Sequence, residues 1–304
     1  KGYSLDLAAT GQALGRFQPL LGVTWPQLDP VDLTATVEGD LEKVTIDDFT
    51  FRSVTTDLFG HGSVVFDPEA IEIEAVVTSD VTDLTRLFPD YEPARAPDLI
   101  SAEEAKSVVP AKDREKVFSD EPLPLKFLRT ADIDISFQPK KFVTPYGVFE
   151  NVNLRVVLEE DALNVRPLEA RDADSDLRGD FSLDARGQTP LVGLSLRSPD
   201  IQIGQLFKDF ANLDVLEGSG AIDIALSGSG NSIAAIAGSL DGHARQLMGK
   251  GRMRNEGLGY VSGLFSGIGE ALGGKSWVAV DCMANDFEFK DGVATSRVNL
   301  LSTE

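Results

Sequence analysis

The sequence predicts a mainly β fold, built as an elongated antiparallel sheet with a few short helices. Three observations predict it. Apolar and polar residues alternate with a period of two along many short segments, which is typical of strands with one buried and one wet face. Turn residues separate these segments, as in an antiparallel meander. Residues 62–88 and 179–207 also look like two copies of one unit, and repeats usually build extended surfaces.

The two copies of the repeated unit agree in composition and in spacing. Each copy begins with glycine, continues with alternating apolar residues to an aspartate, and ends with a Leu-Phe pair. The segments 73–88 and 192–207 match without a gap. A repeated unit buries its apolar surface against its neighbours along one axis, so we expect an extended surface rather than a single catalytic pocket.

The first module, residues 1–88, is predicted to hold one short helix and several strands. The helix is expected at residues 8–21, before a loop marked by prolines. The strand segments alternate apolar and polar residues, and they are 33–37, 49–51, 64–66 and 71–75. Alternation of this kind places the apolar side chains of one strand on the same side.

Residues 89–121 break the alternation. They contain prolines and a charged stretch, namely Pro89, Pro93, Pro97, Pro110 and residues 112–116. Proline lacks the N–H that a central strand donates, so we interpret 89–121 as an irregular linker with one short helix around 101–108. The linker separates the first β module from a second one at residues 122–304.

The second module shows the clearest alternation in the chain. Ile133, Ile135 and Phe137 share one parity, and the residues between them are polar. The pattern continues in the segments 152–158, 163–165, 181–183, 194–196, 222–226, 278–282, 287–289 and 298–300. Short helices are expected at 202–210, 233–237 and 257–274, the last from the helical spacing of its apolar residues.

Composition and charge exclude several classes of function. Hydrophobic residues make up 42% of the 304 residues, which is enough for a folded core. The net charge of −21 argues against nucleic acid, because a phosphate-binding surface needs clustered Lys and Arg. It also disfavours flat adsorption on an anionic bilayer. The single cysteine, Cys282, forms no internal disulfide, and His61 and His243 leave little material for a metal or triad site.

The ends of the chain indicate an excerpt of a longer protein. The sequence starts at Lys1 without an initiator methionine and stops at Glu304 inside a strand-like segment. It contains no signal peptide and no apolar run of about 18 residues or more, so we expect no membrane span within it.

Residues 269–276 match the P-loop pattern of nucleotide-binding proteins letter by letter. A P-loop must follow a strand and open a helix, so that the helix N-terminus meets the phosphates. Here a helical pattern precedes the loop and a strand pattern follows it. We therefore expect Gly273 and Gly274 to end a helix, with Lys275 near its C-terminus. We predict that ATP does not bind, which isothermal titration would test.

Other candidate sites are equally weak. Asp172, Asp174 and Asp176 alternate as at the start of a calcium loop, but Leu177 and Leu183 replace the required glycine and glutamate. A solvated loop is the simpler interpretation. We find no nucleophile–base arrangement, no zinc spacing and no dinucleotide fingerprint. We therefore expect that the protein binds no cofactor and is not an enzyme.

One basic cluster stands out in this acidic chain. It consists of Arg245, Lys250, Arg252 and Arg254, with His243 beside it. Such a cluster could contact lipid head groups or a protein partner, since clustered cations attract anionic groups. A solvated loop that balances nearby acidic residues is the alternative.

Residues 118–300 resemble the C-terminal region of the AsmA-like family. The resemblance rests on short strand and turn motifs that follow one another in a fixed order. These motifs are 122–129, 131–135, 152–156, 163–170, 179–185, 218–224, 228–230, 238–242 and 287–293. Their order over this length, more than any one motif, carries the resemblance.

The resemblance implies a fold and a function. Members of the family are usually fixed in the inner membrane of Gram-negative bacteria by one N-terminal helix, with the remainder in the periplasm. They are similar to TamB and to bridge-like lipid transfer proteins. The resemblance therefore implies a curved sheet with an open apolar groove that moves phospholipid between the inner and outer membranes and supports envelope integrity. The membrane anchor would lie outside this excerpt.

A groove of this kind would be lined by apolar residues of one strand parity, in contact with phospholipid acyl chains. The candidate lining residues are Ile133, Ile135, Phe137, Val152, Leu154, Val156, Phe181, Leu183, Leu194, Leu196, Ile222, Ile224, Leu226, Phe287 and Phe289.

Two alternatives stay open at the level of sequence. The same alternation builds an ordinary β-sandwich with a closed core. An envelope scaffold or assembly factor could instead bind a protein partner along an exposed sheet edge. Whether the apolar faces are open or covered distinguishes these possibilities.

Overall fold

The structure is a computed structural model, and it describes most of the chain. The described residues are 2–11, 30–67, 71–87, 118–129, 131–144, 147–172, 175–204, 216–254 and 277–303. The helices expected at 101–108 and 257–274 and the P-loop pattern at 269–276 lie outside these ranges, as does most of the expected linker.

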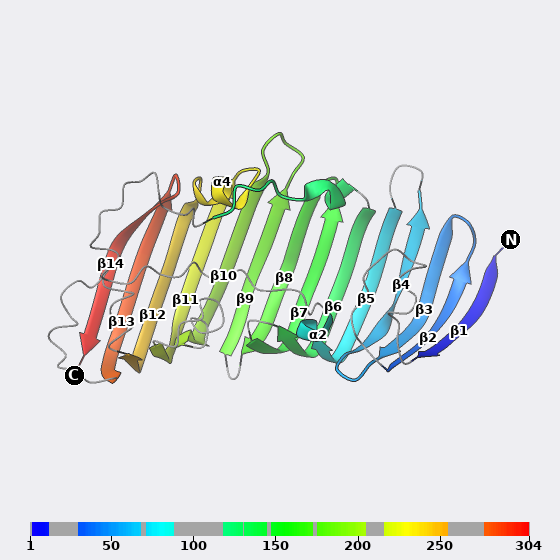
Figure 1. Ribbon diagram of the computed structural model, residues 1–304, viewed down its shortest axis with the longest axis horizontal. Helices are drawn as coiled ribbons and strands as arrows, with labels where there is room; N and C mark the ends of the chain where they lie inside the picture. Colours follow the sequence, from blue (N-terminus) through cyan, green and yellow to red (C-terminus); the bar gives the residue numbers. More distant parts are fainter. Residues whose placement is uncertain are drawn as a thin grey trace. The chain divides into compact units, whose positions relative to one another are not determined.

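All the strands of the described residues belong to one fourteen-stranded sheet, in which strand order follows chain order (Figure 1). The strands are β1 (Tyr3–Gly11), β2 (Val31–Gly39), β3 (Lys43–Arg52), β4 (Asp57–Phe66), β5 (Ile71–Asp83), β6 (Ala131–Thr144), β7 (Gly147–Glu159), β8 (Ala162–Asp172), β9 (Ser175–Asp184), β10 (Leu191–Gln202), β11 (Leu216–Ser229), β12 (Asp241–Arg254), β13 (Trp277–Lys290) and β14 (Val293–Thr303). The predicted mainly β fold is confirmed. The alternative of a closed two-sheet sandwich is wrong for the described strands.

The strands pair as the turn pattern predicts, with one exception. Neighbours whose register is defined are antiparallel, except that β5 and β6 are parallel. Parallel neighbours need a crossover connection of about a dozen residues or more. The segment between Asp83 and Ala131 supplies that length, so the sheet continues across the region predicted as a linker. The linker role of 89–121, and with it the division into modules 1–88 and 122–304, stays a prediction.

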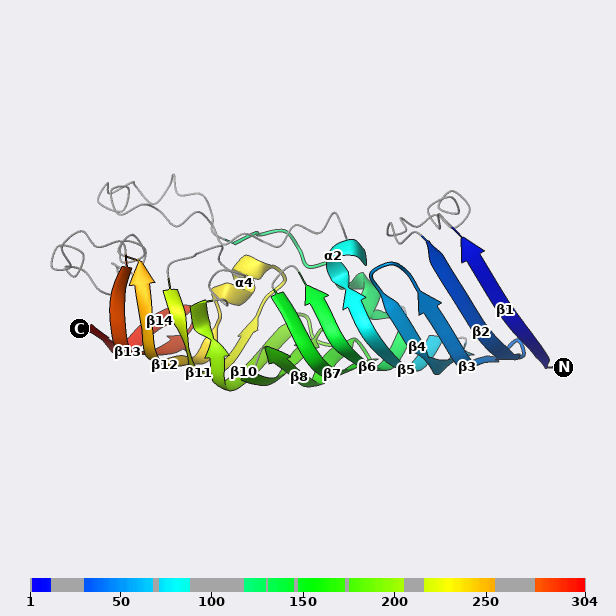
Figure 2. The ribbon, with the colours of Figure 1, turned by 90° about the horizontal axis from the view of Figure 1, so that it is seen from below.

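Short helical elements accompany the sheet. α2 (Leu84–Leu87) contacts β6, the 3-10 turn η3 (Leu125–Arg129) leads into β6, and α4 (Ile233–Ala237) contacts β11 (Figure 2). The helix predicted at 233–237 is confirmed. Its N-cap Ser232 accepts a hydrogen bond from the Ala235 N–H at 3.1 Å, which satisfies a donor that the first turn leaves open.

Two other expected helices lie only partly within the described residues. Ala8 to Gly11 belong to β1, where Ala8 lies opposite Thr34 of β2, so the helix predicted at 8–21 is wrong over these residues. The sheet ladder overrides the helical preference of the alanines. Of the helix expected at 202–210, Gln202 still belongs to β10, residues 203–204 are helical as predicted, and 205–210 lie outside the described residues.

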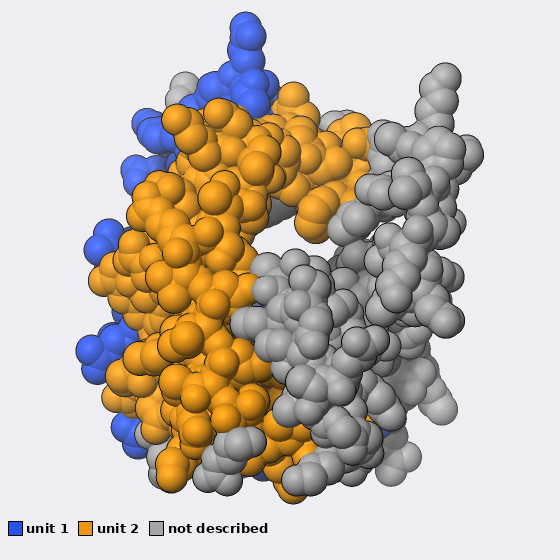
Figure 3. All heavy atoms as spheres, turned by 90° about the vertical axis from the view of Figure 1, so that its left-hand side faces the viewer, with its two compact units in different colours: residues 1–92, 124–174, 178–190 blue, residues 93–123, 175–177, 191–304 orange. Residues whose placement is uncertain are grey.

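The chain divides into two compact units, coloured in Figure 3. Unit 1 comprises residues 1–92, 124–174 and 178–190, and unit 2 comprises 93–123, 175–177 and 191–304. The first copy of the repeated unit corresponds to β4, β5 and α2, and the second to β9 and β10. Each unit presents one apolar sheet face, and these faces are described separately below.

Candidate apolar binding surfaces

Unit 1 carries an apolar face whose centre lies on β5, β6 and β7. The register places Ile133 opposite both Ile73 and Leu158. One step along, Ile135 lies opposite Ala75 and Val156. Directly paired residues of neighbouring strands project on the same side of a sheet. The register therefore joins the alternation of three separate strands into one surface.

The same surface continues over the other strands of unit 1. Register shifts change the parity within β3 and β8, but the residues on both sides of each shift still pair with apolar neighbours: Ile46 and Phe49 face Val37 and Ala35, and Val165 and Leu168 face Val156 and Leu154. We call this set the unit 1 apolar face, and it comprises Leu5, Leu7, Leu33, Ala35, Val37, Ile46, Phe49, Phe51, Val64, Ile73, Ala75, Val77, Ile133, Ile135, Phe137, Leu154, Val156, Leu158, Leu163, Val165 and Leu168, with Tyr3, Phe66 and Ile71 at its margin.

The unit 1 apolar face is only partly buried. Large side chains on β1, β2, β4 and β5 are 37–50% exposed, and they are Tyr3, Leu5, Leu7, Leu33, Phe66 and Ile71. A contiguous set of half-exposed apolar side chains marks a surface that contacts an apolar ligand, a membrane or another protein.

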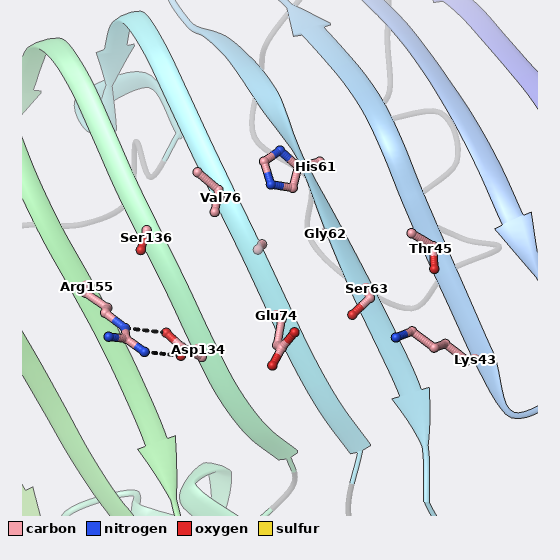
Figure 4. A pocket seen from close by; sticks show the side chains of 11 residues that line it. Lys43, Thr45, His61, Gly62, Ser63, Glu74, Val76, Asp134, Ser136 and Arg155 are labelled. Carbon is pink, nitrogen blue, oxygen red and sulfur yellow. Dashed lines mark hydrogen bonds and ion pairs between the residues drawn. The ribbon is translucent and has the colours of Figure 1, made fainter.

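The opposite face of unit 1 is polar. An open depression there is lined by Lys43, Thr45, His61, Glu74, Asp134 and Arg155, among others (Figure 4). The Arg155 guanidinium forms a bidentate ion pair with the Asp134 carboxylate, and its Nε donates a hydrogen bond of 2.7 Å to Oδ1. This hydrogen bond lowers the pKa of Asp134 below its usual value. These charged and polar side chains favour contact with water, so the two faces of unit 1 differ in what they can bind.

Unit 2 carries an apolar face of its own. The register aligns Leu196 of β10, Ile224 of β11, Ala244 of β12 and Phe287 of β13 in one row. Leu194, Leu226 and Phe289 lie in the next row. Further along the strands the face becomes a buried cluster of Ile201, Ile203, Leu216, Ile222, Met248, Met253, Val280 and Met283.

Burial separates the two sides of unit 2 sharply. Met248 is 0% exposed, whereas its neighbour Leu247 on the same strand is 58% exposed. Unit 2 also curves around one side of a hollow (Figure 3). Methionine is flexible and fills irregular spaces, which suits a core built on a curved sheet.

A row of polar side chains crosses the unit 2 apolar face. Gln246, Asn285 and Asn299 lie directly opposite one another on β12, β13 and β14. The Asn285 Nδ2 group donates a hydrogen bond of 2.7 Å to Gln246 Oε1. The sequence analysis did not predict this amide row. Gln246 and Asn285 occupy positions in their strands where the alternation places apolar residues on either side.

Most of the predicted lining residues fall into two groups. Ile133, Ile135, Phe137, Leu154 and Val156 lie together on the unit 1 apolar face. Those on the unit 2 apolar face are Leu194, Leu196, Leu226, Ile222, Ile224, Phe287 and Phe289. Val152 is buried on β7, and β9 contributes half-buried Phe181 and buried Leu183. Contact of any of them with lipid stays a prediction.

Sequence reasoning did not include the residues of β1 to β5 in the lining set. Leu5, Leu7 and Ile73 belong to the unit 1 apolar face as fully as Ile133 does. Their signal was the same period-two alternation, which the sequence shows in these segments as well.

The basic residues predicted as one cluster occupy two separate environments. Arg245 lies 3.4 Å from Asp286 and 3.7 Å from Asp223. Arg252 pairs with Glu217 and stacks on the Trp277 ring, with its guanidinium 4.7 Å from the ring centroid. Arg254 stacks on the same ring at 5.1 Å, and Lys250 is exposed on β12. Contact of this set with head groups or a partner stays a prediction.

The candidate metal and thiol residues lie in ordinary strand positions. Asp172 ends β8 and Asp176 belongs to β9, while Asp174 lies outside the described residues. In the part of the chain that the structure describes, no three His, Cys, Asp or Glu residues group as metal ligands would. His61 faces the polar side of β4, and Cys282 is half-buried in β13. Among the described residues, no helix has the length and apolar character to cross a bilayer.

Comparison with known proteins identifies the family. The sequence profile of the AsmA family matches residues 35–298. The chain belongs to the AsmA family. The match begins in β2, so the family relationship extends well beyond the 118–300 region that carries the motifs.

The chain is also similar to one curated AsmA protein. The AsmA family protein YhjG of Escherichia coli (strain K12) is 24% identical to it over 324 residues. The match covers 100% of this chain and 46% of YhjG, so the chain spans about half the length of that relative. No solved structure matches this AsmA chain.

Proposed function

We propose that this AsmA protein binds the acyl chains of phospholipids on its apolar sheet faces and transfers phospholipid between the inner and outer membranes. The observation that carries the proposal is the unit 1 apolar face. It extends across β1 to β8, and large side chains on β1, β2, β4 and β5 are 37–50% exposed. A sheet face of this kind offers hydrocarbon contact without closing on a second sheet.

The free energy of exposing an acyl chain to water supports a role in shielding lipid. Moving one methylene group from an apolar site into water costs about 0.8 kcal/mol. An acyl chain of about 16 carbons therefore faces a cost on the order of 12 kcal/mol when it crosses water unshielded. An apolar sheet face offsets part of that cost by contact alone, so transfer requires no catalytic group and no cofactor.

Membership of the AsmA family supports the place of action. We propose that the protein works in the periplasm of a Gram-negative bacterium, held to the inner membrane by a segment outside these residues, and supports envelope integrity. Fractionation of cells that express the full-length protein, with protease protection of an epitope on the polar face of unit 1, tests this placement.

Lipid binding is tested by placing a charge on the unit 1 apolar face. Ile135 is half-buried and lies between Ala75 and Val156. In Ile135→Asp, an acyl chain over this position would meet a carboxylate without a partner, which costs several kcal/mol. We expect the lipid that co-purifies with the protein, counted by mass spectrometry, to fall several-fold while the thermal melt stays cooperative.

The matched control is Ser136→Asp, which adds the same charge at the next residue on the polar face. Its lipid content should equal that of the unaltered protein. If both variants fold and keep their full lipid content, acyl chains do not contact this face, and a scaffold that binds an envelope protein becomes the better proposal.

A further inference from the structure

The amide row of unit 2 holds hydrogen-bonding groups that the described residues leave unsatisfied. Gln246 and Asn285 lie opposite each other, and Ile222, opposite Gln246, lies in turn opposite Ser198 of β10. The Gln246 Nε2, Asn285 Oδ1 and Ser198 Oγ atoms are buried and have no hydrogen-bond partner among the residues that the structure describes. Buried polar atoms are nearly always satisfied, so three such atoms on one sheet face require an explanation.

The geometry of the pair shows what could satisfy them. Asn285 donates to Gln246 Oε1 at 2.7 Å, which leaves N–H groups on Gln246 and an oxygen on Asn285. Rotating both amides by 180° would reverse the bond but again leave an N–H group and an oxygen. The pair therefore always offers a donor, and the Ser198 hydroxyl offers a second one.

Apolar rows flank the amide row on both sides. Ala244 and Phe287 precede it, and Met248 and Met283 follow it. A ligand that matches these rows carries hydrocarbon next to a small, uncharged hydrogen-bond acceptor. No side chain of the row is charged, so the charged head group of a bound lipid has to lie beyond the row, in water.

We propose that the amide row binds the ester carbonyls of an acyl glycerol lipid, with Gln246 and Ser198 as donors. This proposal rests on the proposed lipid binding and adds a chemical preference to it. Two ester carbonyls accept hydrogen bonds without carrying charge. The attached chains extend over the half-buried row of Ala244 and Phe287, because Met248 and Met283 already lie in the core. The row thus selects ester-linked lipid, whereas the unit 1 apolar face, whose register rows are apolar, does not.

The experiment compares two phosphatidylcholines that differ only at the linkage, one diacyl and the other dialkyl, offered to the whole protein as an equimolar vesicle mixture. An ether oxygen is a much weaker acceptor than an ester carbonyl. One net hydrogen bond changes a binding equilibrium about fivefold. We therefore expect the diacyl lipid to be retained in excess of the dialkyl lipid by up to about fivefold, since lipid on the unit 1 apolar face carries no such preference and dilutes the ratio. Mass spectrometry of the retained lipid gives the ratio directly.

Three variants test whether the amide row causes the preference for diacyl lipid. Gln246→Leu/Asn285→Leu replaces both amides by apolar groups of similar size, and the ratio should fall to about one while total lipid is kept. Ser198→Ala should lower the ratio partly and serves if the double variant does not fold. Gln202→Leu, at an exposed position on β10, is the matched control and should keep the ratio.

The outcomes separate the two proposals. Retention of neither lipid by the unaltered protein overturns both the proposed function and this inference. Equal retention of both lipids leaves lipid binding intact and overturns the inference alone. A preference that survives in the folded double variant also overturns it, since a row that only holds the strands in register would change the melting temperature and not the ratio.

Discussion

Units 1 and 2 present the same kind of sheet face in two different states. On unit 1, Leu5, Leu7 and Phe66 are half-exposed, whereas on unit 2 Met248 and Val280 are buried. Both faces arise from period-two alternation that the register carries from strand to strand. The comparison shows that alternation decides which side a residue takes, but not how deeply that side is buried.

The two faces also differ in chemistry. The central rows of unit 1 are wholly apolar, as in Ile73, Ile133 and Leu158. Unit 2 interrupts its apolar rows with Gln246 and Asn285. A wholly apolar row can only favour hydrocarbon, whereas an amide row discriminates between ligands by their acceptors. We therefore expect unit 1 to contribute affinity and unit 2 to contribute selectivity.

The largest expected effect is a charge in the buried face of unit 2. Met248→Asp would bury a carboxylate without a partner, and we expect it to lower the free energy of unfolding by about 4 kcal/mol or to prevent folding. Leu247→Asp, one residue away on the exposed side, should change stability by less than about 0.5 kcal/mol. Urea unfolding followed by circular dichroism measures both. Similar losses for the two variants would contradict the assignment of buried and exposed sides.

A smaller effect is expected where neighbouring strands approach a glycine. A Cβ atom on Gly60 in unit 1 or on Gly220 in unit 2 would lie 2.0 Å from a carbonyl oxygen of the adjacent strand. We expect Gly60→Ala and Gly220→Ala each to cost about 1–3 kcal/mol, because the strands must move apart. Gly249→Ala meets no atom within 4 Å and is the control. If only one of the two variants loses stability, the strands beside the other glycine can move apart at little cost, and the two units then differ in how rigidly their strands are paired.

The smallest expected effect lies on the polar face of unit 1. Asp134 pairs with Arg155, both partly exposed, so Asp134→Asn should cost no more than about 1 kcal/mol at neutral pH. The pairing lowers the pKa of Asp134 in the folded protein, so its contribution is present above the ordinary value of 3.8 and is lost as pH falls through the lower folded value. Melting temperatures of both proteins should therefore differ at pH 7 and converge as the pH falls below the ordinary value of 3.8. A difference that grows on acidification would contradict the ion pair.

Much of the local structure could be predicted from the residues alone. Ile133, Ile135 and Phe137 indicated a strand and the side that each residue takes, and the short helix expected at 233–237 is α4. The helix expected from Ala8 was wrong up to Gly11, because pairing with β2 decided the conformation of that segment. A local preference yields to a ladder that brings hydrogen bonds from a distant part of the chain.

By itself, the sequence determined most of the strands, though not β1 or β12, together with the parity of their side chains and the resemblance to the AsmA family. Only the tertiary structure decided that β5 and β6 run parallel, that Arg245 and Arg252 bind different acids, and that Gln246 lies opposite Asn285. The physical reason is that parity survives a slip of two residues, whereas the identity of the facing residue does not. The alternation of residues therefore predicts which side of the sheet is apolar. Only the pairing register of the strands shows where that side carries a polar row.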